Sequence, residues 1–225
     1  MKWMGRTEHR EFKDKLYEQF ARVGKALASP KRLEILDLLV QGERHVEAVA
    51  RETAIPMGSA SQHLRVLRDA GMVESRREGL YVYYRLAGED VHGAWRVVRS
   101  LGERRLAEVD RVVEAYLKDR DALEAVCAER LMELLKENEV VVLDVRPEEE
   151  YRAGHLPGAR SIPVDALEAA LQTLPRDKEI VAYCRGPYCV FSDEAVRLLK
   201  ENGYRASRLV EGYPEWRAAG FPTEE

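Results

Sequence analysis

Apolar positions recur at helical spacing near the start of the chain. Between residues 12 and 28 they lie three or four positions apart, which predicts an amphipathic helix. Ser29 and Pro30 form a typical N-cap and first helical position, so a second helix is expected from there to about Val40. Two shorter helices, predicted over residues 46–53 and 59–70, complete a run of four.

The pattern changes to alternation after residue 70. Residues 72–77 and 80–86 alternate around Glu78 and Gly79, which predicts a β-hairpin. Residues 89–118 return to helical spacing with a continuous apolar stripe, which predicts one long helix. That stripe is too apolar for a helix exposed on all sides, so this helix is not expected to stand alone.

Helices alternate with strands beyond residue 120. The buried-type apolar runs are typical of a parallel sheet in a small α/β domain. We predict helices over residues 122–137 and 192–202, and strands over 140–145, 180–184 and 206–210. The chain is therefore expected to hold two domains, residues 1–120 and 121–225, which meet at the end of the long helix.

Charge is distributed unevenly between these two parts. The net charge of the 225 residues is −4, but residues 1–120 carry 23 Lys and Arg against 19 Asp and Glu, whereas residues 121–225 carry 13 against 21. A polyanionic partner is therefore expected on the first part. No run is apolar enough for a membrane helix, and the first residues lack the apolar segment of a signal peptide, so we expect a cytoplasmic protein with reduced cysteines and no membrane contact.

The first part has the element order of a winged helix-turn-helix, a mainly α DNA-binding fold with a β-hairpin wing. Its segments LASPKRLEIL (27–36), SASQHLRVLRDAGMV (59–73) and RREGLYVYYR (76–85) resemble the ArsR/SmtB family of bacterial repressors over about residues 12–118. The resemblance implies a homodimer held by the first and the long helix. It also implies a pseudo-palindromic operator in double-stranded DNA.

The helix predicted over residues 59–70 is then the recognition helix. Short polar side chains at its start can reach base edges in the major groove, while arginines on the helix and the wing can reach phosphates. Taken singly, each residue is equally well explained as an exposed polar side chain, and only the ordered set points to DNA. We predict DNA contacts from Ser59, Ser61, Gln62, His63, Arg65, Arg68, Arg76 and Arg77.

Metal sensing, which is common in the resembled family, is not expected here. No cysteine precedes Cys127. Asp90 and His92 resemble the start of the family's long-helix metal site, but Glu103 and Leu106 stand where the pattern needs the remaining ligands. We predict neither a metal nor another cofactor.

The segment YCRGPYC places Cys184 and Cys189 five positions apart, between a predicted strand and a predicted helix. Backbone N–H groups and a helix N-terminus converge at such a turn and favour a thiolate, so Cys184 is predicted to be reactive. Arg185 supplies a guanidinium for an anionic substrate. Gly186 allows close backbone approach, Pro187 stiffens the loop and Tyr188 completes it. A zinc pair would need further ligands that the chain does not offer at this spacing.

This loop and the segments LDVRP (143–147), YRAGHLPGA (151–159) and EGYPEW (211–216) resemble a rhodanese-like domain over about residues 122–222. The resemblance implies that Cys184 accepts sulfane sulfur from a donor such as thiosulfate or a persulfide, as a cysteine persulfide. It also gives Asp144 and Arg146 a structural role, and the six-residue loop favours sulfur over phosphate or arsenate.

Cys189 stands where the resembled family most often carries Arg. It is either a second thiol that closes a disulfide or polysulfide with Cys184, or a small loop-packing residue. Cys127 is interpreted as a core residue of an amphipathic helix.

Three functions fit these patterns. The first is a DNA-binding regulator, a repressor, whose rhodanese-like domain senses reactive sulfur through Cys184 and Cys189. The second is a thiosulfate or persulfide sulfurtransferase that is tethered to a DNA-binding domain. The third makes the second domain an inert module that stabilises the dimer.

Overall fold

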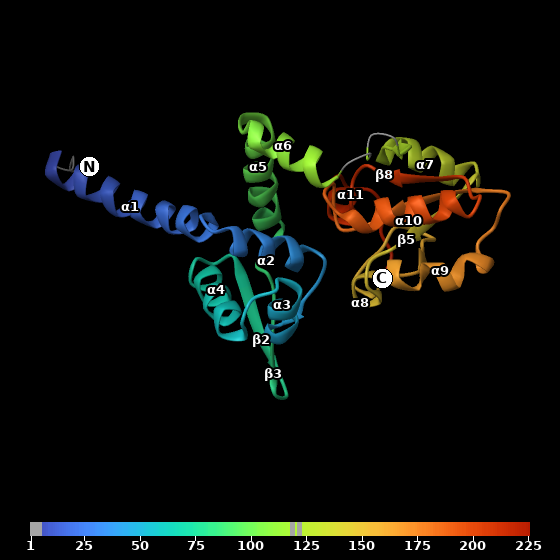
Figure 1. Ribbon diagram of the computed structural model, residues 1–225. Coiled ribbons are helices and arrows are strands. Elements are labelled where there is room, and N and C mark those ends of the chain that lie inside the picture. The colour runs from blue at the N-terminus through green and yellow to red at the C-terminus, as the bar shows by residue number, and fades with distance from the viewer. Residues whose placement is uncertain (1–5, 118–119, 121–122) are drawn as a thin grey trace. The chain divides into compact units, whose positions relative to one another are not determined.

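The structure is a computed structural model that describes residues 6–117, 120 and 123–225 (Figure 1). It divides into two compact units, Met1–Leu101 and Gly102–Glu225. The predicted junction at residues 118–121 lies largely outside the described residues, so the domain boundary at residue 120 stays a prediction. No helix in the described part of the chain is long and apolar enough to cross a membrane.

Three helices build the core of the first unit. They are α2 (Pro30–Val40), α3 (Val46–Glu52) and α4 (Met57–Asp69), and each agrees with the prediction to within two residues. Ser29 is the N-cap of α2 and Pro30 lies in its first turn, as predicted. The apolar faces of the helices meet in one cluster that includes Ile35, Leu36, Val49, Leu64 and Leu67.

The predicted hairpin is present and forms the wing. Strands β2 (Val73–Glu78) and β3 (Tyr81–Leu86) pair antiparallel, with Glu78 opposite Tyr81. The turn between them needs Gly79, whose φ of 60° is costly for any residue with a Cβ. A two-residue strand that the sequence did not predict, β1 (Arg44–His45), pairs with β3 and makes the order β1-β3-β2. Helices α2 to α4 and this wing form a winged helix-turn-helix.

Helix α1 (Arg6–Leu27) leaves its apolar stripe open to water. It extends away from α2, α3 and α4 in Figure 1, and every side chain from Thr7 to Lys25 is exposed. Phe20, for example, is 60 % exposed. The stripe comprises Phe12, Leu16, Phe20 and Val23.

The single long helix predicted over residues 89–118 is wrong, because two helices stand in its place. These are α5 (Glu89–Arg105) and α6 (Ala107–Tyr116). Leu106 between them has φ −117° and ψ 101°, an extended conformation that ends the helical hydrogen-bond pattern. The sequence has no proline here, so the apolar spacing alone did not reveal the break.

A five-stranded sheet forms the centre of the second unit, with the order β4-β8-β7-β5-β6 and every neighbouring pair parallel. This confirms the predicted α/β domain, although the sequence missed the two shortest strands. The strands are β4 (Ala125–Val126), β5 (Val140–Asp144), β6 (Arg160–Ser161), β7 (Glu179–Tyr183) and β8 (Ala206–Leu209).

Helices cover both faces of this sheet. One core cluster joins β5 and β7 to α9 (Leu167–Ala170) and α10 (Val190–Glu201). A second cluster on the other face joins the sheet to α7 (Ala128–Lys136) and α11 (Tyr213–Ala218). Short helices α8 (Glu148–Arg152), η2 (Val164–Ala166) and η3 (Leu171–Thr173) also belong to this unit. Because both faces are covered, the central strands are apolar throughout.

Cys127 corrects the interpretation of the segment before β5. The predicted helix over residues 122–137 begins only at Ala128, because Ala125 and Val126 pair with β8 instead. Cys127 is the N-cap of α7 and is exposed, so the prediction that it is a core residue is wrong.

Candidate functional site

Helix α4 presents a polar face opposite its buried one. Ala60, Leu64 and Leu67 are fully buried against α2 and α3. Their spacing of four and three residues leaves the other side of the helix to solvent. Five of the predicted DNA-contact residues lie there and are exposed: Ser59, Ser61, Gln62, Arg65 and Arg68.

His63 differs from these five residues because it is half-buried. Burial lowers the pKa of its imidazole below the ordinary value of 6.5, and the neighbouring cations Arg32 and Lys31 lower that pKa further. The lowered pKa favours the neutral imidazole, in which one ring nitrogen can donate a hydrogen bond and the other can accept one.

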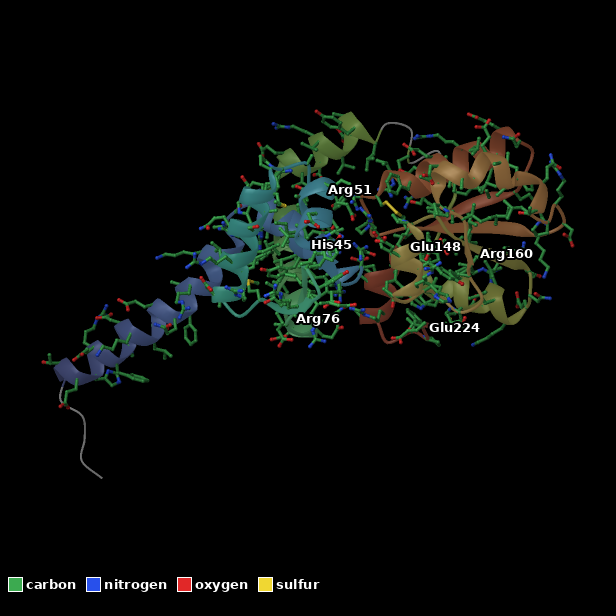
Figure 2. All side chains as sticks on the ribbon, turned by 90° about the horizontal axis from the view of Figure 1, so that it is seen from below. His45, Arg51, Arg76, Glu148, Arg160 and Glu224 are labelled. Carbon is green, nitrogen blue, oxygen red and sulfur yellow. A yellow bond between two sulfur atoms is a disulfide. The ribbon has the colours of Figure 1, made fainter. Side chains whose placement is uncertain are left out.

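The two wing arginines have different surroundings. Arg76 donates from Nε to both carboxylate oxygens of Glu43 at 2.9 and 2.8 Å, and it also pairs with Glu78. These hydrogen bonds raise the pKa of Arg76 further above its usual value. Arg77 is exposed, and its Nε donates to the Gly79 carbonyl oxygen at 3.2 Å. Arg76, labelled in Figure 2, must leave two carboxylates before it can contact a phosphate.

The cysteine loop occupies the turn from β7 into α10. Cys184 follows the last residue of β7, and Cys189 is the N-cap of α10. Their sulfur atoms are joined in a disulfide, visible as the yellow bond in Figure 2, and the two Cα atoms lie 6.2 Å apart. Cys184 is only 2 % exposed, whereas Cys189 is half-buried. The Cys189 N–H donates to the Gly186 carbonyl oxygen at 3.1 Å and closes a tight turn.

A second segment packs directly beneath this loop. A Cβ on Gly212 would lie 2.3 Å from the Gly186 nitrogen, so only glycine fits at that position. The Tyr213 N–H donates to the Cys184 carbonyl oxygen at 3.1 Å. From the sequence, Gly186 was expected to be the residue that allows a close backbone approach. A Cβ on Gly186 would in fact lie no nearer than 3.7 Å to any atom beyond its chain neighbours, so the close contact depends on Gly212 instead. Gly212 was missed, although its segment was part of the rhodanese-like pattern.

Arg185 is held by an ion pair rather than left open. Its Nε donates to both oxygens of Glu150 at 3.0 and 3.1 Å. Glu150 lies in α8 and is fully buried. A guanidinium held in this bidentate geometry is fixed in position and has fewer donors left for a substrate.

Asp144 and Arg146 form a buried network behind the loop. Both side chains are fully buried, and Arg146 donates to Asp144 through Nε at 3.0 Å and to the Gly154 carbonyl oxygen through Nη2 at 2.8 Å. The Tyr183 hydroxyl also donates to Asp144, and burial raises the pKa of that phenol. Because Tyr183 directly precedes Cys184, the network fixes the end of β7, as expected for a structural role.

Arg120 makes a further contact that the sequence did not reveal. Its side chain is largely buried and donates to the carbonyl oxygen of Pro187, inside the cysteine loop. Its Nε also lies 3.1 Å from a carboxylate oxygen of Asp193 in the first turn of α10. Arg208 faces the same carboxylate at 3.7 Å. Burial raises the pKa of Asp193, and the two arginines oppose that rise.

No group of three His, Cys, Asp or Glu side chains within residues 6–117, 120 and 123–225 is arranged to hold a metal ion. The candidate functional sites are therefore the polar face of α4, the wing and the cysteine loop.

Comparisons with known proteins match each unit separately. Residues 27–76 match the model of a helix-turn-helix domain family, and residues 128–219 match that of the rhodanese-like domain. The chain is 46% identical over 210 residues to the HTH-type transcriptional regulator Rv0324 of Mycobacterium tuberculosis, which covers 93% of this chain and 92% of that protein.

Two solved structures resemble the two parts. The homodimeric winged helix-turn-helix domain of Mb0332 from Mycobacterium bovis, described as a possible ArsR-family regulator, is 46% identical, with a TM-score of 0.42, and covers 47% of this chain and 94% of its own. A rhodanese-related protein from Thermoplasma volcanium is 28% identical, with a TM-score of 0.41. The match covers 45% of this chain and 96% of that protein's chain.

The relative from M. tuberculosis is matched over nearly its whole length, across both units. The chain therefore belongs to the family of HTH-type transcriptional regulators, as a DNA-binding protein that joins an ArsR-type winged helix-turn-helix domain to a rhodanese-like domain.

Proposed function

We propose that this regulator is a repressor that senses reactive sulfur through Cys184 and Cys189. The observation that carries the proposal is the bond between these two sulfur atoms inside one six-residue loop. A pair that is close enough to bond can record an oxidative event as a covalent change. No such pair exists in the described part of the DNA-binding unit, where the chain has no cysteine at all.

The chemistry needs only a sulfane donor. The Cys184 thiolate attacks the sulfane sulfur, the donor's S–S bond breaks, and Cys184 carries a persulfide while the donor's remainder leaves with the electron pair. The Cys189 thiolate then attacks Sγ of Cys184 and expels the outer sulfur, which takes up a proton as hydrosulfide. The two thiols are oxidised to a disulfide and the sulfane sulfur is reduced to sulfide.

The DNA-binding half acts as a homodimer in this proposal. The apolar stripe of α1 is exposed along the helix, and an unpaired stripe of this kind indicates a protein partner. A two-fold dimer presents two copies of α4 to a pseudo-palindromic operator, in the cytoplasm. The exposed residues of α4 and Arg77 make the first contacts, and Arg76 joins them after it releases Glu43 and Glu78.

The test is a mobility shift with reduced protein and a DNA fragment that this protein selects from a random pool. Treatment with a sulfane donor should weaken binding at least tenfold, and the Cys184→Ser variant should bind but not respond. Cys127→Ser, which removes the exposed cysteine outside the loop, should respond like the wild type. Equal affinity of the wild type before and after complete disulfide formation rules the proposal out.

The alternative is a sulfurtransferase, favoured by the same rhodanese-like loop and its support by Tyr213. An enzyme must pass the outer sulfur to an external acceptor faster than Cys189 removes it. Thiocyanate formation from cyanide should then continue through many turnovers in the wild type and increase in Cys189→Ser. A single turnover that ends in the disulfide favours the sensor.

A further inference from the structure

We propose that the sulfane donor for this loop is an uncharged dialkyl polysulfide rather than an anion such as thiosulfate. The proposal rests on the proposed function, since it assigns a substrate class to the same two cysteines. Two independent features of the second unit carry it: the pairing of the cations around the loop and a cavity beside it.

Three arginines around the loop, Arg185, Arg120 and Arg208, each face a buried carboxylate. Arg185 binds Glu150 through two hydrogen bonds from its Nε. Arg120 pairs with Asp193 and donates a hydrogen bond to the Pro187 carbonyl oxygen. Arg208, whose side chain is 13 % exposed, faces Asp193 as well. An anionic donor would have to break such a pair and leave a buried carboxylate unpaired, which is costly.

A cavity of about 470 Å³ borders the loop within the same compact unit. Tyr188 and Val190, the two neighbours of Cys189 in the sequence, form one wall. Among its lining residues in the described part of the chain, only Glu108 is charged, and this anion repels a second anion. The opposite wall is formed by Val109, Val112, Val113 and Tyr116 of α6 together with its C-cap Leu117.

Such a cavity suits a donor with apolar ends. Burying a methyl or larger alkyl group against valine, leucine and tyrosine side chains is favourable, whereas a thiosulfate dianion would lose hydration without gaining a partner. The donor's sulfur chain is itself apolar. The cavity therefore favours dialkyl polysulfides beside the loop.

The reaction is balanced for dimethyl trisulfide. The Cys184 thiolate attacks the central sulfur and methanethiolate leaves. The Cys189 thiolate then attacks Sγ of Cys184, and methyl perthiolate leaves. One trisulfide and two thiols thus give the disulfide, methanethiol and methyl hydrodisulfide.

The experiment compares dimethyl trisulfide with thiosulfate on the reduced full-length chain. Peptide mass spectrometry gives the rate at which the Cys184 thiol is consumed, and the exposed Cys127 of the same chain corrects for the intrinsic reactivity of each donor. The corrected preference for the trisulfide should be at least tenfold. An equal or greater corrected rate with thiosulfate overturns the inference.

Two variants at one cavity position sharpen the test. Val112 is 57 % exposed, so it tolerates exchange. Val112→Lys should raise the thiosulfate rate at Cys184 about fivefold, the factor for one charge pair at about 4 Å in water, while Val112→Met should leave it unchanged. An unchanged thiosulfate rate in Val112→Lys contradicts the cavity as the donor site. The proposed function fails separately, if Cys184 reacts with neither donor or if its reaction leaves DNA affinity unchanged.

Discussion

At the scale of single residues, the cysteine loop depends on a glycine outside it. Gly212 lies so close to Gly186 that any side chain would collide with backbone atoms. Because backbone cannot move aside like the end of a flexible side chain, the loop or α11 must shift to accommodate a Cβ.

Gly212→Ala should therefore destabilise the second unit by about 2 kcal/mol, within the range of overpacking substitutions. It should also slow disulfide formation, because the loop that brings Cys184 to Cys189 is displaced. Denaturant unfolding and a thiol-consumption assay measure the two effects. Gly102→Ala is the matched control: Gly102 lies in α5 with open space around it, and this exchange should leave stability unchanged or raise it.

His63 gives a second prediction at this scale, on pH. The folded chain lowers its pKa below 6.5, so the unfolded chain takes up the proton first as the pH falls. The free energy of unfolding should then decrease from about pH 6.5 down to the folded pKa and show no further effect of His63 below it. NMR titration of the imidazole measures the pKa directly. His63→Gln should flatten the pH dependence of stability, and a His63 pKa above 6.5 contradicts the assignment.

At the scale of elements, the sequence predicted the helices with caps and the longer strands. Ser29 and Pro30 located the start of α2, and the apolar runs located β5 and β7. Strands of two residues, such as β1 and β4, were missed because two positions cannot show a period. The break at Leu106 was missed because the apolar stripe continues through it.

In the candidate site too, contacts between residues close in the sequence could be predicted, whereas contacts between distant residues could not. The proximity of Cys184 and Cys189 could be predicted, because they lie only five positions apart in the sequence. The pairing of Arg185 with Glu150 and of Arg120 with Pro187 could not be predicted, since the partners are 35 and 67 positions apart in the sequence. Only the folded sheet brings these groups to one edge.

The exposed stripe of α1 gives a prediction for assembly. Phe20→Glu places a charge in the proposed dimer interface, where an unpaired carboxylate is costly to bury, and should weaken self-association at least tenfold. Light scattering across a concentration series measures this. Gln19→Glu adds the same charge at the exposed neighbouring position and should not weaken the dimer. Equal association of the two variants would show that the stripe serves another partner.

At the scale of the whole molecule, the candidate DNA-binding surface and the cysteine pair lie in different units. The first carries the exposed polar face of α4 and the wing, and the second carries the bonded cysteine pair. The helix α5 runs from Glu89 to Arg105 and so belongs to both units, which makes the chain itself a covalent link between the sulfur site and the DNA-binding fold. The central claim is that the state of the cysteine pair sets the affinity for DNA.

The most direct test follows both quantities in one sample. Reduced protein bound to a fluorescent DNA fragment is titrated with dimethyl trisulfide, while intact mass gives the fraction that has lost two hydrogens to the Cys184–Cys189 bond and anisotropy gives the fraction of DNA released. We predict that the two fractions rise together and that a thiol reductant reverses both. Complete disulfide formation with the DNA still fully bound would contradict the claim.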